Sequence, residues 1–234
     1  MDISANHLTR QIDLIPSNSL HVPIHVVGAG AIGSFAVLSL AKMGLNNFTV
    51  YDFDEVSVEN MNSQFYRFKD IGASKVLALQ SLVKDFTGLE IKVVNRAFVE
   101  SDAQYLQGIV VSAVDSMEAR TMIYNSVKAY GFSVTHIIDP RMSAEYYAQY
   151  TINPFSGSDQ MTYAKTLYTD KEAVAERCTA KSTVYTATLA AGLVVKTIKD
   201  IITKADVHPR IIHWSIASCA APMMMYPSEN MGTK

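Results

Sequence analysis

The chain has 234 residues, of which 49% are hydrophobic and 18% charged, and its formal net charge is -2. This near-neutral balance excludes the strongly basic surface of a nucleic-acid binder or a membrane-surface protein, and no apolar run reaches the ~20 residues of a membrane span. Two cysteines are too few for a disulfide framework or a four-cysteine zinc site. We therefore expect a cytoplasmic protein that binds neither nucleic acid nor membrane.

Hydrophobic runs and turn residues predict the elements of the chain in order. We expect strands at 24–27, 48–51, 91–94, 108–114, 134–138, 147–152 and, as the last strand, 210–215. Helices are expected at 34–43, 71–85, 117–129 and 182–202, and a polar loop at 153–163. This alternation predicts an α/β fold with a mostly parallel central sheet and helices on both faces.

A glycine-rich turn follows the first predicted strand: Gly28-Ala29-Gly30-Ala31-Ile32-Gly33. Glycines in this spacing allow a tight turn and close approach of a phosphate to free amides at a helix start. Asp52 ends the second predicted strand, where a carboxylate can accept hydrogen bonds from ribose hydroxyls. The pattern predicts a Rossmann-like nucleotide site, but it does not distinguish NAD from ATP. A glycine turn without a ligand is the alternative.

The residues from Asp52 onward help to distinguish an ATP site from an NAD site. They comprise Asp52-Phe53-Asp54-Glu55-Val56, then Glu59-Asn60-Met61-Asn62-Ser63-Gln64-Phe65, then Asp70-Ile71-Gly72 and Lys75. This run resembles the ThiF-type superfamily, which includes the adenylyltransferases of thiamine and molybdopterin biosynthesis and the ubiquitin-activating enzymes. The resemblance extends from Arg10 to about Ile198. It implies a single ThiF-like adenylation domain over residues 1–234, with a short N-terminal extension.

The resemblance implies ATP and Mg²⁺ as cofactors and a carrier protein with a C-terminal glycine as substrate. Its carboxylate, already ionised at pH 7, attacks the α-phosphate without a general base. By resemblance Lys75 reaches the phosphates, and Asn62 and Gln64 supply uncharged hydrogen bonds near them. Asp54 and Asn60 complete the nucleotide-binding set. For Lys75, a solvated helix lysine is the alternative interpretation.

Asp115 follows the strand predicted at 108–114, and the resemblance makes it the Mg²⁺ ligand. The alternative is an N-cap of the next helix, a position that aspartate favours. Arg120, within that helix, is either part of the site or one half of a structural ion pair. Asp139-Pro140-Arg141 ends another predicted strand, and there we favour a local salt bridge over contact with the substrate tail.

The chain departs from the family pattern at Ser63, where the family carries an arginine. Arg67 is one candidate replacement. Arg10 is another, because it resembles an N-terminal family arginine that reaches the ATP of a dimer partner. This predicts a homodimer; a disordered terminal residue is the alternative. The chain lacks the C-x-x-C pairs of zinc-binding family members, so we expect no zinc.

Cys178 lies between Arg177 and Lys181, just before the helix predicted at 182–202. Basic neighbours and a helix start lower a thiol pKa, and the thiolate is the nucleophile. Cys178 is therefore a candidate acceptor for an activated acyl group, with a small buried residue as the alternative. We expect Cys219 to be core packing.

We thus expect an adenylyltransferase acting on a ubiquitin-like or sulfur-carrier protein, with transfer to Cys178 left open. Two other classes remain: an NAD-dependent oxidoreductase, favoured only by the glycine turn, and a non-catalytic nucleotide-binding dimerisation partner, favoured by Ser63.

Overall fold

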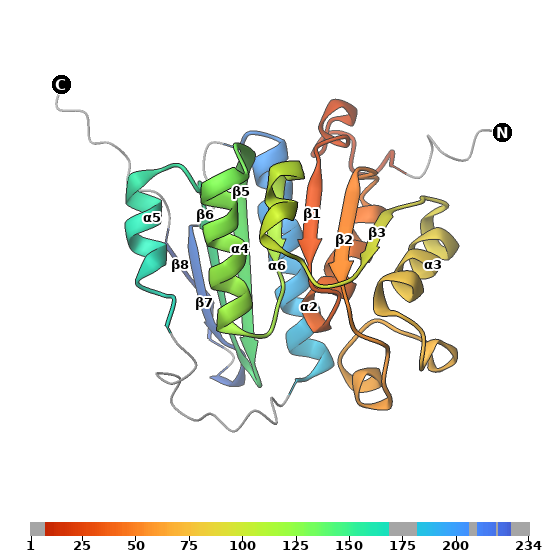
Figure 1. The fold of residues 1–234 in the computed structure, drawn as a ribbon. Coiled ribbons are helices and arrows are strands. Elements are labelled where there is room, and N and C mark those ends of the chain that lie inside the picture. Colours follow the sequence, from red (N-terminus) through yellow and green to blue (C-terminus); the bar gives the residue numbers. More distant parts are fainter. Residues whose placement is uncertain (1–7, 169–181, 206–209, 219, 226–234) are drawn as a thin grey trace.

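The computed structural model describes residues 8–168, 182–205, 210–218 and 220–225 (Figure 1). Within this part of the chain, eight strands form one sheet in the order β3-β2-β1-β4-β5-β6-β7-β8. The strands are β1 (Ile24–Val27), β2 (Phe48–Asp52), β3 (Lys92–Asn95), β4 (Gln107–Ser112), β5 (Ser133–Ser143), β6 (Tyr146–Ile152), β7 (Ile211–Ser215) and β8 (Met223–Met225). The helices are α2 (Ala31–Lys42), α3 (Lys75–Thr87), α4 (Met117–Tyr130), α5 (Gly157–Ala164) and α6 (Val184–Ile202).

The sheet is parallel from β3 to β5 and antiparallel from β5 to β8. The chain winds outward from β1 to β2 and β3, then returns to place β4 on the other side of β1. The carboxyl ends of β1 and β4 therefore lie at the point where the winding direction reverses. Crevices at such points are where open α/β sheets bind ligands.

Helices cover both faces of the sheet, as expected from the sequence. Alternate residues of β1 enter two different cores: Ile24 and Val26 join the first, and Val27 joins the second. Residues of α2, α3 and α6 complete the first core, whereas residues of α4 and α5 complete the second. In Figure 1, α4 lies in front of the sheet and α2 and α6 lie behind it.

Helix α3 begins four residues later than the sequence predicts, at Lys75. Gly72 has a φ of +82°, a left-handed conformation that a continuous helix does not allow. Ser74 forms a β-bridge with Glu55, so this stretch is tied to the chain that leaves β2. The connection thereby fixes where the first turn of α3 lies.

Two other expectations, both in the C-terminal half of the chain, are wrong. The polar segment predicted as a loop contains α5, because Ser156 caps it by accepting a hydrogen bond from the Asp159 amide. The strand predicted at 210–215 is not the last, because β8 follows it and pairs with its outer side, at the edge of the sheet. Among the described residues, no helix is long and apolar enough to cross a membrane.

Candidate nucleotide site

The glycine turn joins β1 to α2, and two of its glycines are required by the fold itself. Gly28 has a φ of +103°, and a Cβ there would lie 2.4 Å from the Ala113 carbonyl oxygen. A Cβ on Gly33 would lie 2.0 Å from the Gly28 carbonyl oxygen. Gly30 differs, because a Cβ there would meet no heavy atom within 4 Å. Its open side leaves the backbone accessible to a ligand.

Asp52, at the end of β2, holds this turn in place. Its Oδ2 accepts a hydrogen bond from the Ala29 amide at 2.6 Å, and its Oδ1 accepts one from the Asp54 amide at 2.8 Å. A carboxylate has about four lone-pair sites, so acceptor capacity remains. Ala31 and Ile32 lie in the first turn of α2, where backbone amides lack intrahelical acceptors. These amides form an anion-binding end beside Asp52.

Tyr66 is a site residue that the sequence reasoning missed. Its hydroxyl donates a 2.6 Å hydrogen bond to the Ala29 carbonyl, so the chain after β2 folds back onto the turn. Burial, with the nearby carboxylate of Asp52, raises the pKa of Tyr66 well above its usual value, and the hydroxyl stays a donor. The amide of Phe65 adds a 3.0 Å hydrogen bond to the Ser34 hydroxyl in α2. Nothing local in the sequence marks these long-range contacts.

Lys75 opens α3 and points back toward β2. Its Nζ lies 2.7 Å from Oδ2 of Asp54, and its amide donates to the Asp54 carbonyl at 2.9 Å. The lysine side chain is only 8% exposed, whereas the Asp54 side chain is 48% exposed. Lys75 is thus a buried, paired cation at this edge of the sheet, and the solvated-lysine interpretation is wrong.

The three amide side chains of the expected set lie in different environments. Asn60 accepts a 2.9 Å hydrogen bond from the Ser57 amide and so caps the short helix η2 (Val58–Asn62). Asn62 is exposed. The Oε1 atom of Gln64 is buried without a hydrogen-bond partner. Ser63, which takes the place of the family arginine, is buried.

Asp115 lies beyond β4, next to the glycine turn in the sheet order, and its side chain is exposed. The N-cap of α4 is Ser116, whose hydroxyl accepts from the Ala119 amide at 3.2 Å. The N-cap interpretation of Asp115 is therefore wrong. No cluster of three or more acidic, histidine or cysteine side chains suited to a metal occurs among the described residues. One carboxylate, completed by substrate phosphates and water, nevertheless suits Mg²⁺.

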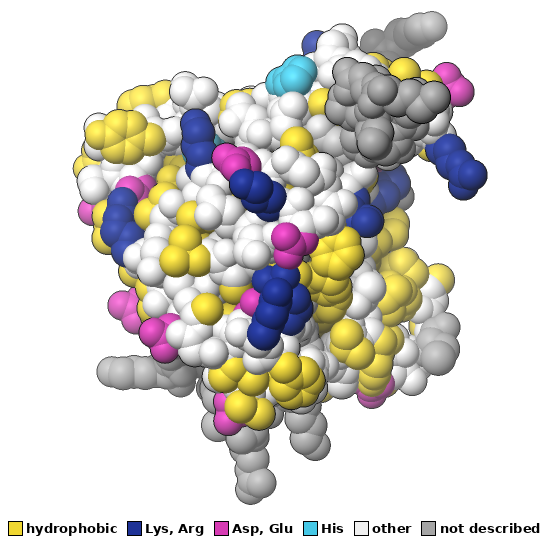
Figure 2. All heavy atoms as spheres, turned by 90° about the vertical axis from the view of Figure 1, so that its right-hand side faces the viewer, with side chains coloured by type: hydrophobic (Ala, Val, Ile, Leu, Met, Phe, Trp, Pro, Cys, Tyr) yellow, Lys and Arg dark blue, Asp and Glu magenta, His cyan; other side chains and the backbone are white. Residues whose placement is uncertain are grey.

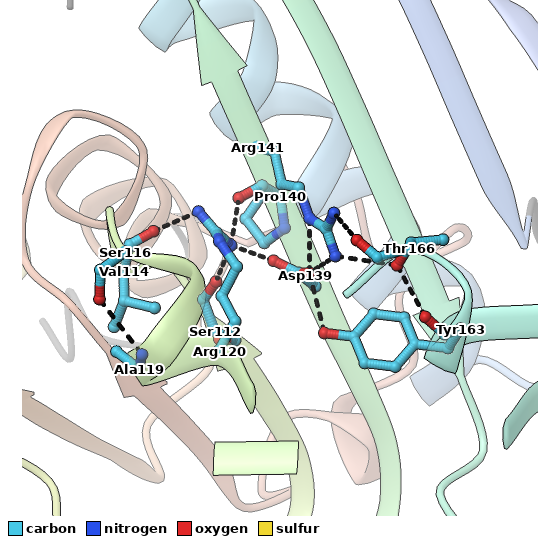
Figure 3. Close-up of polar contacts among 10 residues, drawn as sticks. All are labelled: Ser112, Val114, Ser116, Ala119, Arg120, Asp139, Pro140, Arg141, Tyr163 and Thr166. Carbon is cyan, nitrogen blue, oxygen red and sulfur yellow. Dashed lines mark hydrogen bonds and ion pairs between the residues drawn. The ribbon is translucent and has the colours of Figure 1, made fainter. Parts of the chain in front are cut away.

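Arg120 is buried and forms an ion pair with Asp139, so it is one half of a structural ion pair (Figure 3). Asp139 is fully buried and lies inside β5, which runs on to Ser143, so the strand does not end there as predicted. Arg141 lies 2.7 Å from the same carboxylate, which confirms the expected local salt bridge. The hydroxyl of Tyr163 donates to it at 2.9 Å.

The other candidate residues are already paired, lie at the far end of α2, or fall outside the described residues. Arg67 contacts Asp70 and Asp85 at 2.9 and 2.6 Å, so its guanidinium is already paired. Arg10 is exposed near the carboxyl end of α2, because Gln11 beside it donates to the Met43 carbonyl at 2.6 Å. The turn lies at the opposite end of that helix. Cys178 and Cys219 lie outside the described residues.

An apolar cavity of about 470 Å³ lies beside these paired residues, between α2, α3 and the start of α6. Its lining comprises Phe35, Gln64, Phe65, Tyr66, Arg67, Leu82, Asp85, Phe86 and Val184. Figure 2 shows the α3 side of the molecule, where hydrophobic side chains lie exposed beside charged ones. No residue of the glycine turn is among those that line this cavity.

The sheet order, the glycine turn and the carboxylate after β2 define the Rossmann-like α/β class. Within that class, the chain belongs to the ThiF family, which matches residues 17–229. Its α/β architecture is also that of the E. coli MccB structure with ATP, at a TM-score of 0.73 and 14% identity. That alignment covers 94% of this chain and 71% of MccB.

Two curated relatives match less than half of the chain. The NEDD8-activating enzyme E1 catalytic subunit of Dictyostelium discoideum is 33% identical over 102 residues, or 42% of this chain and 23% of that protein. The tRNA threonylcarbamoyladenosine dehydratase of Escherichia coli K12 is 31% identical over 106 residues, or 43% of this chain and 40% of that protein. The matches thus span less than half the length of either relative.

Proposed function

We propose that this protein uses MgATP to adenylate the C-terminal carboxylate of a small ubiquitin-like or sulfur-carrier protein. The observation that carries the proposal is that three features follow the carboxyl ends of the neighbouring parallel strands β1, β2 and β4: the open backbone at Gly30, the buried cation of Lys75 paired with Asp54, and the exposed carboxylate of Asp115. A dehydrogenase needs the first feature alone. The relation to a NEDD8-activating enzyme and the likeness to a structure with ATP support the same activity.

In the proposed reaction, a carboxylate oxygen forms a bond to the α-phosphorus and the bond to the pyrophosphate oxygen breaks. The acyl adenylate remains and pyrophosphate leaves. Since the nucleophile is ionised at pH 7, the protein must position it and neutralise phosphate charge. The amides at the start of α2 and the ammonium of Lys75 do so, and Asp52 orients the ribose. Asp115 would hold Mg²⁺, which supplies further charge neutralisation when bound.

A homodimer is part of this proposal. Arg10 and the glycine turn lie at opposite ends of α2, and a helix of 12 residues is about 18 Å long. Arg10 therefore cannot easily serve the turn of its own chain, whereas it can serve that of a second copy. With Ser63 buried and Arg67 paired, an arginine from a partner would supply the cation that the family pattern places after Asn62.

Transfer of the activated acyl group to Cys178 is the further step that we propose. A thiolate attacks the acyl carbon of the adenylate and AMP leaves, so a thioester links carrier and enzyme. Arg177 and Lys181 favour the thiolate at neutral pH. With a Cys178→Ala variant, adenylate formation should continue while the thiol-sensitive adduct disappears. Persistence of the adduct in that variant would show that another residue is the acceptor.

The decisive experiment combines binding with turnover. Calorimetric titration should show MgATP binding much more tightly than NAD. ATP–pyrophosphate exchange should then appear with one of a panel of ubiquitin-like proteins ending in Gly-Gly, and not with the same protein amidated at its C-terminus. Tighter binding of NAD would support the oxidoreductase instead. MgATP binding without exchange across the whole panel would support the non-catalytic dimerisation partner.

A further inference from the structure

The loop that carries Asp115 begins where the β4–β5 ladder ends. The last paired residues of this parallel ladder are Val111 and Ile138. Strand β4 stops one residue later, at Ser112, whereas β5 continues through Asp139 and Pro140. Backbone carbonyls beyond this point need donors from another source, because buried carbonyl groups are almost always paired.

Arg120 supplies those donors. Its Nη1 donates to the carbonyls of Ser112 at 3.2 Å and Pro140 at 3.3 Å, and its Nη2 donates to the carbonyl of Val114. Figure 3 shows the guanidinium lying between the end of β4, the start of α4 and β5. One side chain thus fixes both sides of the gap between the strands.

The guanidinium itself is held rigidly. Arg120 is 6% exposed, and its counterion Asp139 is fully buried. Asp139 also contacts Arg141 and Tyr163, so it cannot follow Arg120 if that side chain moves. A buried charge is stable only when its hydrogen-bonding groups are satisfied. These contacts hold the guanidinium of Arg120 in place, and with it the Val114 carbonyl that it binds.

We propose that Arg120 is a positioning residue that holds the backbone at Val114 and thereby aims the carboxylate of Asp115 toward the glycine turn. Val114 is the residue before Asp115, and Ser116 after it is fixed as the N-cap of α4. The backbone on both sides of the exposed Asp115 carboxylate is thus held in place. The proposal rests on the proposed function in one respect, that Asp115 holds the Mg²⁺ of MgATP.

Arg120→Lys tests this, because lysine keeps the charge beside Asp139 but lacks the planar fork that reaches three carbonyls. Arg141→Lys is the matched control, since Arg141 binds the same carboxylate and Thr166 but none of the β4–α4 loop. Hydrogen–deuterium exchange is measured on the nucleotide-free protein. In Arg120→Lys we expect the amides of Ala113 and Ala119, which donate to the Val27 carbonyl and the Ser116 hydroxyl, to exchange at least tenfold faster, with residues 28–33 unchanged. In Arg141→Lys, faster exchange should be confined to residues 163–167.

The second measurement is the affinity for ATP with Mg²⁺ and with EDTA. Wild type should bind ATP more tightly with Mg²⁺; in Arg120→Lys this gain should shrink severalfold, while the affinity in EDTA stays the same. Unchanged hydrogen–deuterium exchange at Ala113 and Ala119, or an equal loss of affinity with and without Mg²⁺, would overturn the proposal. Asp139→Asn, which removes the anchor of Arg120, should act in the same direction. If both variants fail to fold, the network supports the whole fold and the proposal is also overturned. If the wild-type protein does not bind ATP, the proposed function is refuted. The hydrogen–deuterium exchange result for Arg120→Lys would still stand.

Discussion

The ammonium of Lys75 lies 2.7 Å from the carboxylate of Asp54, across the chain that joins β2 to α3. The pair keeps a buried cation at the edge of the glycine turn before any phosphate is present. Lys75→Met should therefore lower the affinity for MgATP at least tenfold, or about 1.4 kcal/mol. Asp54→Asn, which keeps a hydrogen-bond acceptor beside the ammonium, should lower it less. Calorimetry on both variants checks the order, and equal losses would show that Lys75 acts only through the pair.

The two glycines Gly28 and Gly30 should respond oppositely to alanine. Gly30→Ala meets no atom of the chain, so its unfolding free energy should change by no more than about 1 kcal/mol, while MgATP binding weakens strongly. Gly28→Ala places a Cβ 2.4 Å from the Ala113 carbonyl at a φ of +103°, so the fold itself should be destabilised. Thermal unfolding and nucleotide titration separate the two effects. Normal binding by Gly30→Ala would mean that no ligand approaches this backbone.

Asp115→Ala should abolish ATP–pyrophosphate exchange without loss of stability. Because the carboxylate is exposed and does not cap α4, its removal leaves the fold intact. Loss of electrostatic stabilisation of this kind is often about 3 kcal/mol, or a hundredfold or more in rate. Glu118→Ala is the control, because it removes another exposed carboxylate from the first turn of α4: it should cost no more than about 1 kcal/mol of stability and leave the activity unchanged. Near-normal pyrophosphate exchange by Asp115→Ala would exclude the metal role.

Mixing inactive chains tests the role of Arg10. If Arg10 completes the site of a second copy, a mixture of Arg10→Ala and Asp115→Ala chains should recover part of the pyrophosphate exchange. In a mixed dimer, one site has both its own Asp115 and an intact Arg10 from its partner. Analytical ultracentrifugation should show a dimer, the commonest closed assembly. A monomer with full exchange activity would contradict the prediction.

The buried imidazole of His25 should make the protein sensitive to mild acid. Burial, with a smaller contribution from Lys92, lowers the pKa of His25 from 6.5 to about 4. Between these values the unfolded chain binds a proton that the folded chain does not, so stability should fall as pH drops from 6.5 to 4. The loss attributable to this group is at most about 3 kcal/mol. Denaturant unfolding at several pH values should show a shallower fall for His25→Gln, and identical slopes would assign the acid sensitivity to other groups.

The sequence was enough to predict the features that depend on short spacings. The glycine turn and Asp52 lie where a strand–turn–helix pattern places them, whereas Lys75 was expected from the family resemblance. The antiparallel strand β6 begins within one residue of its predicted start. The contacts of Tyr66 with Ala29 and of Arg120 with Pro140 could not be predicted from the sequence, because each joins residues brought together only by the folded sheet.

The missed helix α5 has a different cause. Its N-cap, Ser156, is present in the sequence, but the neighbouring proline and glycine favoured a loop. The late start of α3 likewise depends on a long-range bridge between Glu55 and Ser74, which overrides the local preference for helix.

The peptide groups on either side of Ala29 are held from opposite directions, its amide by Asp52 and its carbonyl by Tyr66. The turn consequently has its shape before a nucleotide arrives. Binding then costs little conformational entropy at this loop, and no slow ordering step precedes it. Nucleotide association should therefore be a single fast phase, and any slower phase after it would report movement elsewhere in the protein.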